Sequence, residues 1–289
     1  MLKKEKLIEY LLLFCASLSI IFLFGIAISL FKEGLPIFKV VDPIKFIFGK
    51  SWYPTHEPPE FGILPLILAS LLVTVGALTV AVPLGIGSAI YIAELSHPRI
   101  REIIKPIVEL LAGVPSVIYG FFGMVVFAPF IQRLFHIPVG LTAFTASVIL
   151  GIMALPTITS IAEDAITSIP KDMKEASYAL GATKWETITR TVIPAARSGI
   201  LTAIILGLGR AIGETMTVLM VAGGAAVIPR SFLQPVRPMT ATIAAEMGEA
   251  PMGSLHYHSL FAIAAVLFLI TLGFNILANY IKEKGYEKI

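Results

Sequence analysis

The sequence predicts an all-α membrane protein with six transmembrane helices. Apolar residues make up 56% of the 289 residues and charged residues 14%, and the mean hydropathy is +0.87, far from the composition of soluble domains. Five uncharged runs reach the ~20 residues that a helix needs to cross a bilayer, at 10–31, 61–93, 110–132, 137–162 and 259–281. A sixth run, at 198–228, is interrupted only by Arg210 and Glu214.

The first run predicts a helix that stands apart from the others. A cleaved signal peptide is the alternative for residues 1–31, but the run exceeds the usual apolar core of about 7–15 residues, so an uncleaved helix is favoured. Residues 32–60 are rich in Pro and aromatic residues and predict an extracytoplasmic loop, with Trp52 and Tyr53 in the interfacial belt. We therefore expect two units, an accessory helix with its loop (1–60) and a helical core (61–289).

Two of the core runs contain residues that weaken helices. Close helix packing is the favoured explanation, since small residues let backbones approach in lipid, and lining or hinging of a pathway is the alternative. The residues concerned are Pro83, Gly85, Gly87, Gly113, Pro115 and Gly120.

Loop charge predicts the orientation in the membrane. Of the 22 Lys and Arg residues, 14 fall in segments that are cytoplasmic if the N-terminus is inside, and 7 fall in the outer segments. Basic residues gather on the cytoplasmic side, so both termini are expected there, in a multi-pass protein of the cell (inner) membrane. No basic face interleaved with aromatic residues predicts a nucleic-acid partner.

Several short patterns resemble catalytic or ligand motifs but fail on spacing. FGKS at 48–51 lacks the first Gly of a phosphate-binding loop, and GLGRAIG at 207–213 lacks the third Gly of a dinucleotide fingerprint. His256 and His258 are two residues apart without a Cys or carboxylate neighbour in the sequence, so a solvated loop pair is expected rather than a metal site. Cys15 is the single cysteine. We expect no catalytic residue, cofactor or metal, and no enzyme activity.

The longest inner segment, about 163–194, predicts two short helices joined by a tight turn. Pro170 opens a helix over 171–180, and Gly181 ends it in the left-handed conformation. Thr183 and Glu186 then form a capping box for a second helix that runs to Pro194. An interfacial amphipathic hairpin and a docking element are both compatible with this pattern.

The stretch EASYALGATKWETITRTVIP at 175–194 resembles the EAA loop of ABC importer permeases. Glu175, Ala176 and Ser177 match its triplet, with Ser177 in place of the usual third alanine. Gly181 matches its glycine, and Pro194 lies at its end. The resemblance implies that this loop docks on a separate ATPase subunit and transmits the movement of that subunit to the membrane helices.

Three more stretches resemble PstC-type permeases of phosphate-specific ABC importers: FGILPLILASLLVT, ELLAGVPSVIYGFFG and GRAIGETMTVLMVAG. The resemblance implies a MetI-like type I ABC importer permease fold over 61–289. It implies a membrane subunit that forms the pathway for inorganic phosphate while a separate subunit hydrolyses ATP. The implied partners are a second, PstA-like permease, a PstB-like cytoplasmic ATP-binding dimer and a PstS-like extracytoplasmic phosphate-binding protein.

Arg210, Glu214 and Thr215 are the candidate pathway residues. An ionised side chain near the bilayer centre costs at least ~2.5–3.5 kcal/mol on insertion scales, so the first two are expected to face protein or an aqueous path. At ~1.5 Å per residue Arg210 lies about 20 Å beyond Arg197, with Glu214 one turn further on the same face. We predict that Arg210 contacts passing phosphate. Glu214 is expected to orient Arg210 or to accept a hydrogen bond from the proton of hydrogen phosphate.

Four alternatives remain at this point. Arg210 and Glu214 form a purely structural ion pair in one, and the substrate is another oxyanion, sulfate or molybdate, in the second. The third is an ion-coupled secondary transporter, which the EAA resemblance disfavours because such a carrier has no ATPase to engage. The fourth is a membrane scaffold without transport.

Overall fold

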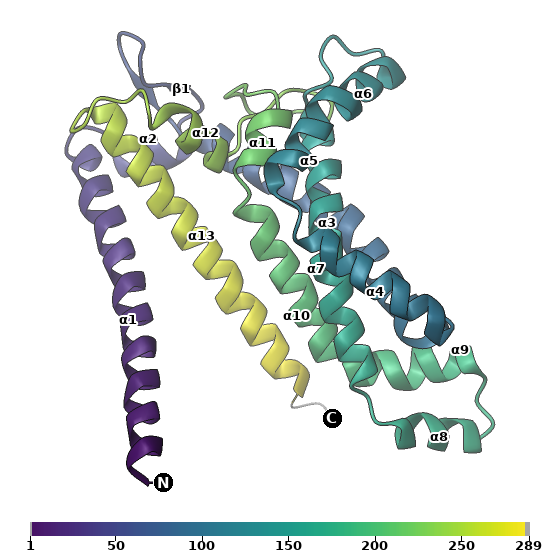
Figure 1. The fold of residues 1–289 in the computed structure, drawn as a ribbon. Helices are drawn as coiled ribbons and strands as arrows, with labels where there is room; N and C mark the ends of the chain where they lie inside the picture. Colours follow the sequence, from purple (N-terminus) through teal and green to yellow (C-terminus); the bar gives the residue numbers. More distant parts are fainter. Residues whose placement is uncertain (1, 287–289) are drawn as a thin grey trace.

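The computed structural model describes residues 2–286, with side chains for residues 6–280. It is almost wholly helical (Figure 1). The α-helices are α1 (Leu2–Gly34), α2 (Pro43–Phe48), α3 (Leu64–Ile90), α4 (Pro98–Ala112), α5 (Ser116–Phe122), α6 (Ala128–Phe135), α7 (Ala143–Thr167), α8 (Lys171–Ala179), α9 (Lys184–Thr187), α10 (Ile193–Ile212), α11 (Met216–Val221), α12 (Met239–Glu246) and α13 (Leu255–Tyr286). A 3₁₀ segment, η1 (Leu35–Lys39), and three π-helical segments, η2 (Tyr91–Leu95), η3 (Gly123–Phe127) and η4 (Ile188–Val192), join them, with two short antiparallel strands, β1 (Trp52–Tyr53) and β2 (Glu60–Phe61).

Six stretches within the described residues are long and apolar enough to span a membrane, as the sequence predicts. They are Lys6–Lys39, Leu64–Leu95, Ser116–Phe135, Ala143–Thr167, Lys184–Ile212 and Leu255–Tyr280. The third begins later than the predicted run at 110, because the chain breaks between Ala112 and Ser116. The break leaves α4 as a separate helix that precedes the span.

Helices α3, α7 and α10 form the centre of the molecule and pack along one another. Small residues make this approach possible, as the packing interpretation of the sequence expects. A Cβ on Gly151 would lie 3.0 Å from the carbonyl oxygen of Ala77, and one on Gly207 would lie 2.6 Å from Ile158. Gly85 also meets Ile158, whereas a Cβ on Gly87 would meet nothing within 4 Å. Packing therefore explains Gly85 but not Gly87.

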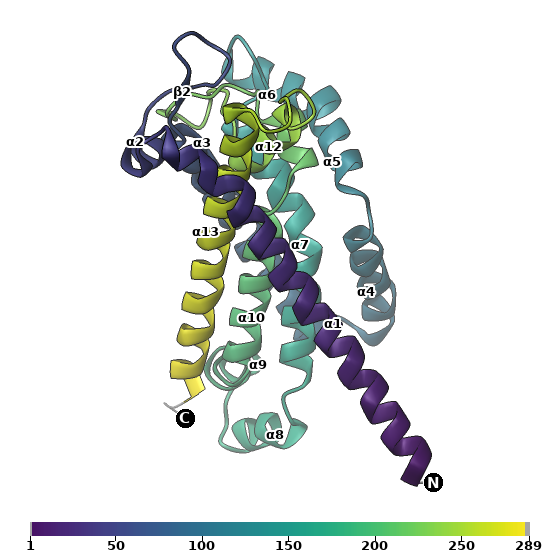
Figure 2. The same ribbon diagram turned by 90° about the vertical axis from the view of Figure 1, so that its left-hand side faces the viewer.

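Helix α1 lies outside this centre and contacts α13 (Figure 2). The two helices approach closely at Gly34, where a Cβ would lie 3.0 Å from the backbone of Ala262. None of the most apolar window of this span is buried inside the chain. The starts of α1 and α9, the end of α13 and helix α8 all lie toward the same end of the molecule (Figures 1 and 2), which we call the hairpin end.

The opposite end is capped by η1, α2, the two strands and α12 (Figure 1). The prediction that Trp52 lies in an interfacial belt is wrong: Trp52 is 2% exposed and donates its indole N–H to Glu246. The expectation of a solvated His256–His258 pair is also wrong. His256 lies 2.9 Å from Glu246 and His258 contacts the carbonyl oxygen of Glu33, both in the first turn of α13. The Trp52 and His258 partners lie 194 and 225 positions away, so local patterns could not indicate them, whereas Glu246 is only 10 positions from His256.

Helices α8 and α9 form the predicted two-helix hairpin. Gly181 has φ +87°, and the amides of Gly181 and Ala182 donate to the carbonyls of Tyr178 and Ser177 in a Schellman ending. The Thr183–Glu186 capping box is present with both reciprocal hydrogen bonds. The structure therefore confirms the turn and the cap.

The expected end of the second hairpin helix at Pro194 is wrong. The helix continues without interruption through η4 into α10, with Pro194 in the first turn of α10. Proline normally disrupts the helix because its ring meets the carbonyl four residues earlier. The π-helical segment immediately before Pro194 adds one residue to the turn, and this changes the backbone hydrogen bonds so that the ring is accommodated. Helix α9 and the membrane helix α10 are thus one continuous rod.

Candidate substrate pathway and coupling hairpin

Two helix breaks meet inside the bundle. One separates α4 from α5 at 113–115, and the other separates α10 from α11 at 213–215. The Thr217 hydroxyl donates to the carbonyl oxygen of Ser116 at 3.0 Å, which joins the two breaks. Gly120 allows this contact, since a Cβ there would lie 3.2 Å from the Cα of Thr217. Broken helices expose backbone polar groups at membrane depth, where they are tolerated only inside protein or along a water-filled path.

Arg210 lies at this junction, in the last turn of α10. Its Nη1 donates to the hydroxyl of Thr157 on α7 at 3.1 Å, and its Nη2 donates to the carbonyl oxygen of Ala112 at 3.3 Å. Thr157 is ten residues from one end of α7 and fourteen from the other, about 15 and 21 Å. The guanidinium is therefore near the middle of the bundle, as the sequence predicts. A guanidinium has five N–H donors, so about three remain for a ligand after these two contacts.

The predicted placement of Glu214 is wrong. Helix α10 ends at Ile212, so Glu214 does not continue the face that carries Arg210. Its carboxylate accepts from the amide of Thr217 at 3.0 Å, and its own carbonyl accepts from Thr240. Among residues 6–280, the ion pairs do not include one between Arg210 and Glu214. Gly213 causes the difference, because it ends the helix and turns the chain into α11.

Thr215 is half-buried in the same break, with its hydroxyl 3.4 Å from the carbonyl oxygen of Gly213. Sequence reasoning did not single out three further polar residues at this junction: Thr157, Thr217 and Tyr119, whose hydroxyl donates to the carbonyl oxygen of Leu111. Their only signal is a hydroxyl within an apolar run. The hydroxyl protons of Thr217 and Tyr119 are donated to backbone carbonyls. Arg210 and the Thr157 hydroxyl, which accepts from it, therefore supply the donors and the fixed positive charge that suit an oxyanion. No three or more His, Cys, Asp or Glu side chains of the described residues could share a metal ion.

The hairpin presents its predicted coupling residues in two ways. Glu175 and Ala176 are exposed on α8, whereas Ser177 is half-buried. The Ser177 hydroxyl lies 3.0 Å from that of Thr187, and the hydroxyl of Thr191 donates to it at 3.4 Å. Ser177 therefore fixes α8 against the η4 segment. Four large apolar side chains remain exposed on this hairpin: Met173, Tyr178, Leu180 and Trp185.

An ion-pair network at the hairpin end ties α4 to α7. Glu163, whose side chain is 2% exposed, accepts from Arg101 and Lys105, and Lys105 also pairs with Asp164 at 2.7 Å. Hydrogen bonds to Asp164 and then Glu163 raise the pKa of Lys105 above its ordinary value of 10.5. The stabilisation from this shift is complete below pH ~10.5 and is lost as the pH rises through the raised pKa. The network is thus intact at physiological pH.

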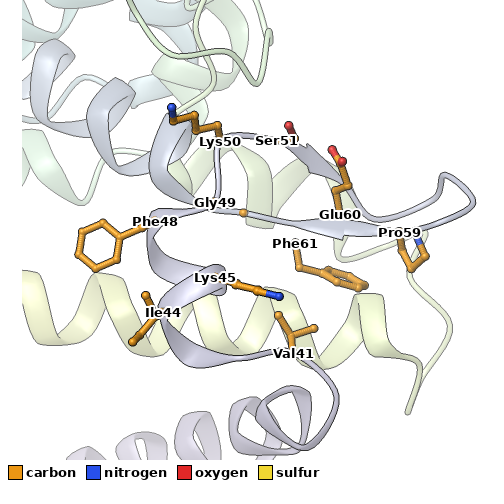
Figure 3. A pocket seen from close by; sticks show the side chains of 11 residues that line it. Val41, Ile44, Lys45, Phe48, Gly49, Lys50, Ser51, Pro59, Glu60 and Phe61 are labelled. Carbon is orange, nitrogen blue, oxygen red and sulfur yellow. The ribbon is translucent and has the colours of Figure 1, made fainter.

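Two cavities at the opposite end are separate from the Arg210 junction. One, of about 520 Å³, lies between α2 and the strands and is lined by Ile44, Phe48 and Lys45, among others (Figure 3). The other, of about 590 Å³, is bordered by Arg237 and Glu246, which form an ion pair at 2.6 Å. Both involve the cap rather than the two helix breaks.

Comparison with known proteins places these features in context. A family described as "Binding-protein-dependent transport system inner membrane component" matches residues 81–284. The chain is 39% identical to the probable ABC transporter permease protein YqgH of Bacillus subtilis, over 93% of this chain and 88% of that protein. It is 40% identical to the phosphate transport system permease protein PstC of Mesorhizobium japonicum, over 92% and 86%.

Solved structures share the fold at low sequence identity. A chain of a bacterial alginate ABC transporter in complex with a periplasmic protein superposes with a TM-score of 0.67 at 18% identity, covering 98% of this chain and 96% of that chain. A chain of the MetNI methionine ABC transporter superposes with a TM-score of 0.58 at 18% identity, over 78% and 94%. The fold expected from the EAA resemblance is confirmed.

Proposed function

Because the chain belongs to the family of binding-protein-dependent transport system inner membrane components, we propose that it is the permease subunit of an ATP-driven phosphate importer. It forms the translocation pathway and does not itself hydrolyse ATP. Its partners are a second, PstA-like permease subunit, a PstB-like ATPase dimer and a PstS-like extracytoplasmic phosphate-binding protein. The similarity to phosphate permeases over most of the chain supports this assignment.

The observation that carries the substrate is the Arg210 guanidinium at the junction of two broken helices. Arg210 receives the phosphate oxygens, because its planar fork matches an oxyanion and about three of its donors are free of the contacts to Thr157 and Ala112. Glu214 and Thr215 border the path at the second break. The Glu214 carboxylate accepts from the amide of Thr217 and does not pair with Arg210, so of its two expected roles we retain the one toward the proton of hydrogen phosphate.

The hairpin end faces the cytoplasm, and both termini lie on that side. The excess of Lys and Arg at this end supports the assignment. Exposed Glu175 and Ala176, with the apolar side chains around them, dock on the ATPase. Gly181 and Pro194 serve the same coupling, one by closing the turn and the other by lying where the hairpin continues into α10.

Phosphate uptake by bacteria that express the complex tests this function. Bacteria that lack their own high-affinity phosphate importer are supplied with this chain, the second permease, the ATPase and the binding protein. Uptake of radiolabelled phosphate, resistant to competition by excess sulfate, is expected only when all four are present. If sulfate or molybdate competed as well as phosphate, the substrate would be oxyanions in general rather than phosphate. Uptake without the ATPase would indicate a secondary transporter.

A further inference from the structure

Helix α8 is connected to all three central helices, but in different ways. The residues 168–170 link it directly to α7, and the hairpin turn with α9 and η4 links it to α10. Its connection to α3 is not covalent. The Lys174 ammonium on α8 donates to the carboxylate of Glu94, which lies in η2, the π-helical continuation of α3.

The surroundings of this ion pair make it stronger than an ordinary surface pair. The side chain of Glu94 is 8% exposed and that of Lys174 is 20% exposed. Charges in such a poorly solvated place attract one another more than in water, whereas fully exposed pairs contribute little. Removing one partner also leaves the other charge poorly solvated and unpaired. Lys171, one turn earlier on α8, is exposed and serves as a matched comparison.

We propose that the Lys174–Glu94 ion pair is the strut through which the hairpin moves α3. The proposal rests on the function above, because it needs a separate ATPase that displaces the hairpin. Lys174 and Glu94 are then positioning residues, because they contact no substrate but transmit the displacement of the hairpin to α3. Without the pair, the Ser177 contacts still hold α8 to α9 and η4, so the hairpin moves with α10 while α3 stays in place.

Helix α3 is built to respond to such a push. Pro83 lies inside it and cannot donate the helical hydrogen bond at its position, which makes this point easy to bend. Gly87 adds freedom one turn later, since nothing lies within 4 Å of the position of a Cβ there. The segment from Pro83 to Glu94 is about 16 Å long. A force on Glu94 thus acts on the end of α3 beyond this bend, together with the part of α7 that Gly85 meets at Ile158.

A charge exchange tests the strut. Lys174→Glu, Glu94→Lys and the double exchange are compared with Lys171→Glu, which makes the same charge change on the exposed part of α8. Each complex is reconstituted with its ATPase and binding protein. Retained ATPase, basal ATP hydrolysis and phosphate imported per ATP are measured. Each single exchange is expected to leave the retained ATPase and the basal ATP hydrolysis unchanged. It is expected to lower the phosphate imported per ATP by about 10-fold, within the range of typical coupling energies.

The double exchange is expected to restore import, and Lys171→Glu to leave it unchanged. A double exchange as defective as the single ones would overturn the proposal. Loss of ATPase from the single variants, with unchanged import per bound ATPase, would also overturn it, because the pair would then serve docking alone.

A distance measurement separates the strut from the substrate assignment. Spin labels at Asp172→Cys on α8 and Tyr91→Cys on η2, both exposed positions, are placed in a Cys15→Ser background. The distance is expected to stay narrow on addition of ATP and to broaden when Lys174→Glu is added. If it does so while the complex imports no phosphate, the proposed function fails and the strut stands. If phosphate is imported and Lys174→Glu leaves the distance unchanged, the strut is wrong.

Discussion

Arg210 is a charged side chain near the middle of an apolar bundle, held by one hydroxyl and one backbone carbonyl. Neither partner is an anion, so the positive charge is solvated by dipoles alone. A half-buried cation in this situation gains most from an anionic ligand that arrives in the path. This arrangement supports a substrate role more than a role in fastening helices.

Arg210→Gln is expected to lower phosphate uptake by at least about 30-fold, the equivalent of ~2 kcal/mol for lost charge-assisted hydrogen bonds. Arg210→Lys keeps the charge but not the planar set of guanidinium donors, so its uptake is expected to lie between that of the wild type and that of Arg210→Gln. The measurement is initial uptake at equal amounts of assembled complex. Arg133→Gln, at an exposed position on α6, is the control. Wild-type uptake by assembled Arg210→Gln would assign a structural role to this residue.

Glu214 allows its charge and its capping role to be separated. Glu214→Gln keeps an oxygen for the amide of Thr217 but removes the charge, whereas Glu214→Ala removes both and costs about 1 kcal/mol of capping. If the charge acts on hydrogen phosphate, both variants lose uptake, and Glu214→Gln discriminates less against sulfate. Normal uptake and selectivity in Glu214→Gln would limit this residue to capping.

At the residue scale, sequence singled out Arg210 and Glu214 as candidates but not the residues that they contact. Arg210 and Glu214 are conspicuous because charge is rare in apolar runs. Thr157 and Ala112, the partners of Arg210, are 53 and 98 positions away. Such pairings depend on how helices pack, which no local pattern records.

The hairpin turn is the element that local sequence determines most strongly. Gly181 has φ +87°, and a Cβ there would meet nothing within 4 Å. A substitution is therefore resisted by the backbone alone, at about 1–2 kcal/mol for the left-handed conformation. Gly181→Val is expected to uncouple ATP hydrolysis from transport while membrane insertion stays normal.

Gly181→Asn is the matched control, since asparagine tolerates this conformation. It is expected to retain most of the transport activity. The ratio of phosphate imported to ATP hydrolysed is the measurement for both variants. Equal, wild-type ratios would mean that the turn geometry does not matter for coupling.

Helix boundaries were predictable where one residue decides them and not where tertiary structure does. The Gly181 turn and the Thr183 cap follow from local hydrogen bonding, and both are present. Hydropathy treated 198–228 as one run, because a three-residue break hardly changes the average over a span. Pro194 was expected to end a helix, but the π-helical segment before it accommodates the ring.

A labelling experiment can test the proposed orientation of the whole molecule in the membrane. In a Cys15→Ser background, which has no cysteine, Thr55→Cys lies in the cap and Met173→Cys lies on the hairpin, and both positions are exposed. A membrane-impermeant maleimide added to intact spheroplasts is expected to label only Thr55→Cys. Labelling of Met173→Cys before permeabilisation would reverse the proposed orientation.

The proposed chain of events runs through the whole molecule. The ATPase moves the hairpin, and the hairpin moves α10 as a continuous rod, α7 through its short link and α3 through Lys174. Helix α10 carries Arg210, and α7 carries its partner Thr157. Movement at one end of the molecule thus changes the surroundings of the substrate at its middle.

ATP-driven phosphate uptake into proteoliposomes tests the central claim most directly. The complex of this chain with the second permease and the ATPase is reconstituted, the binding protein is added outside, and ATP is enclosed. Phosphate is expected to accumulate against its gradient and to stimulate ATP hydrolysis. Arg210→Gln is expected to stop accumulation with the complex still assembled. Accumulation that needs no ATP, or ATP hydrolysis and uptake that do not respond to phosphate, would contradict the account.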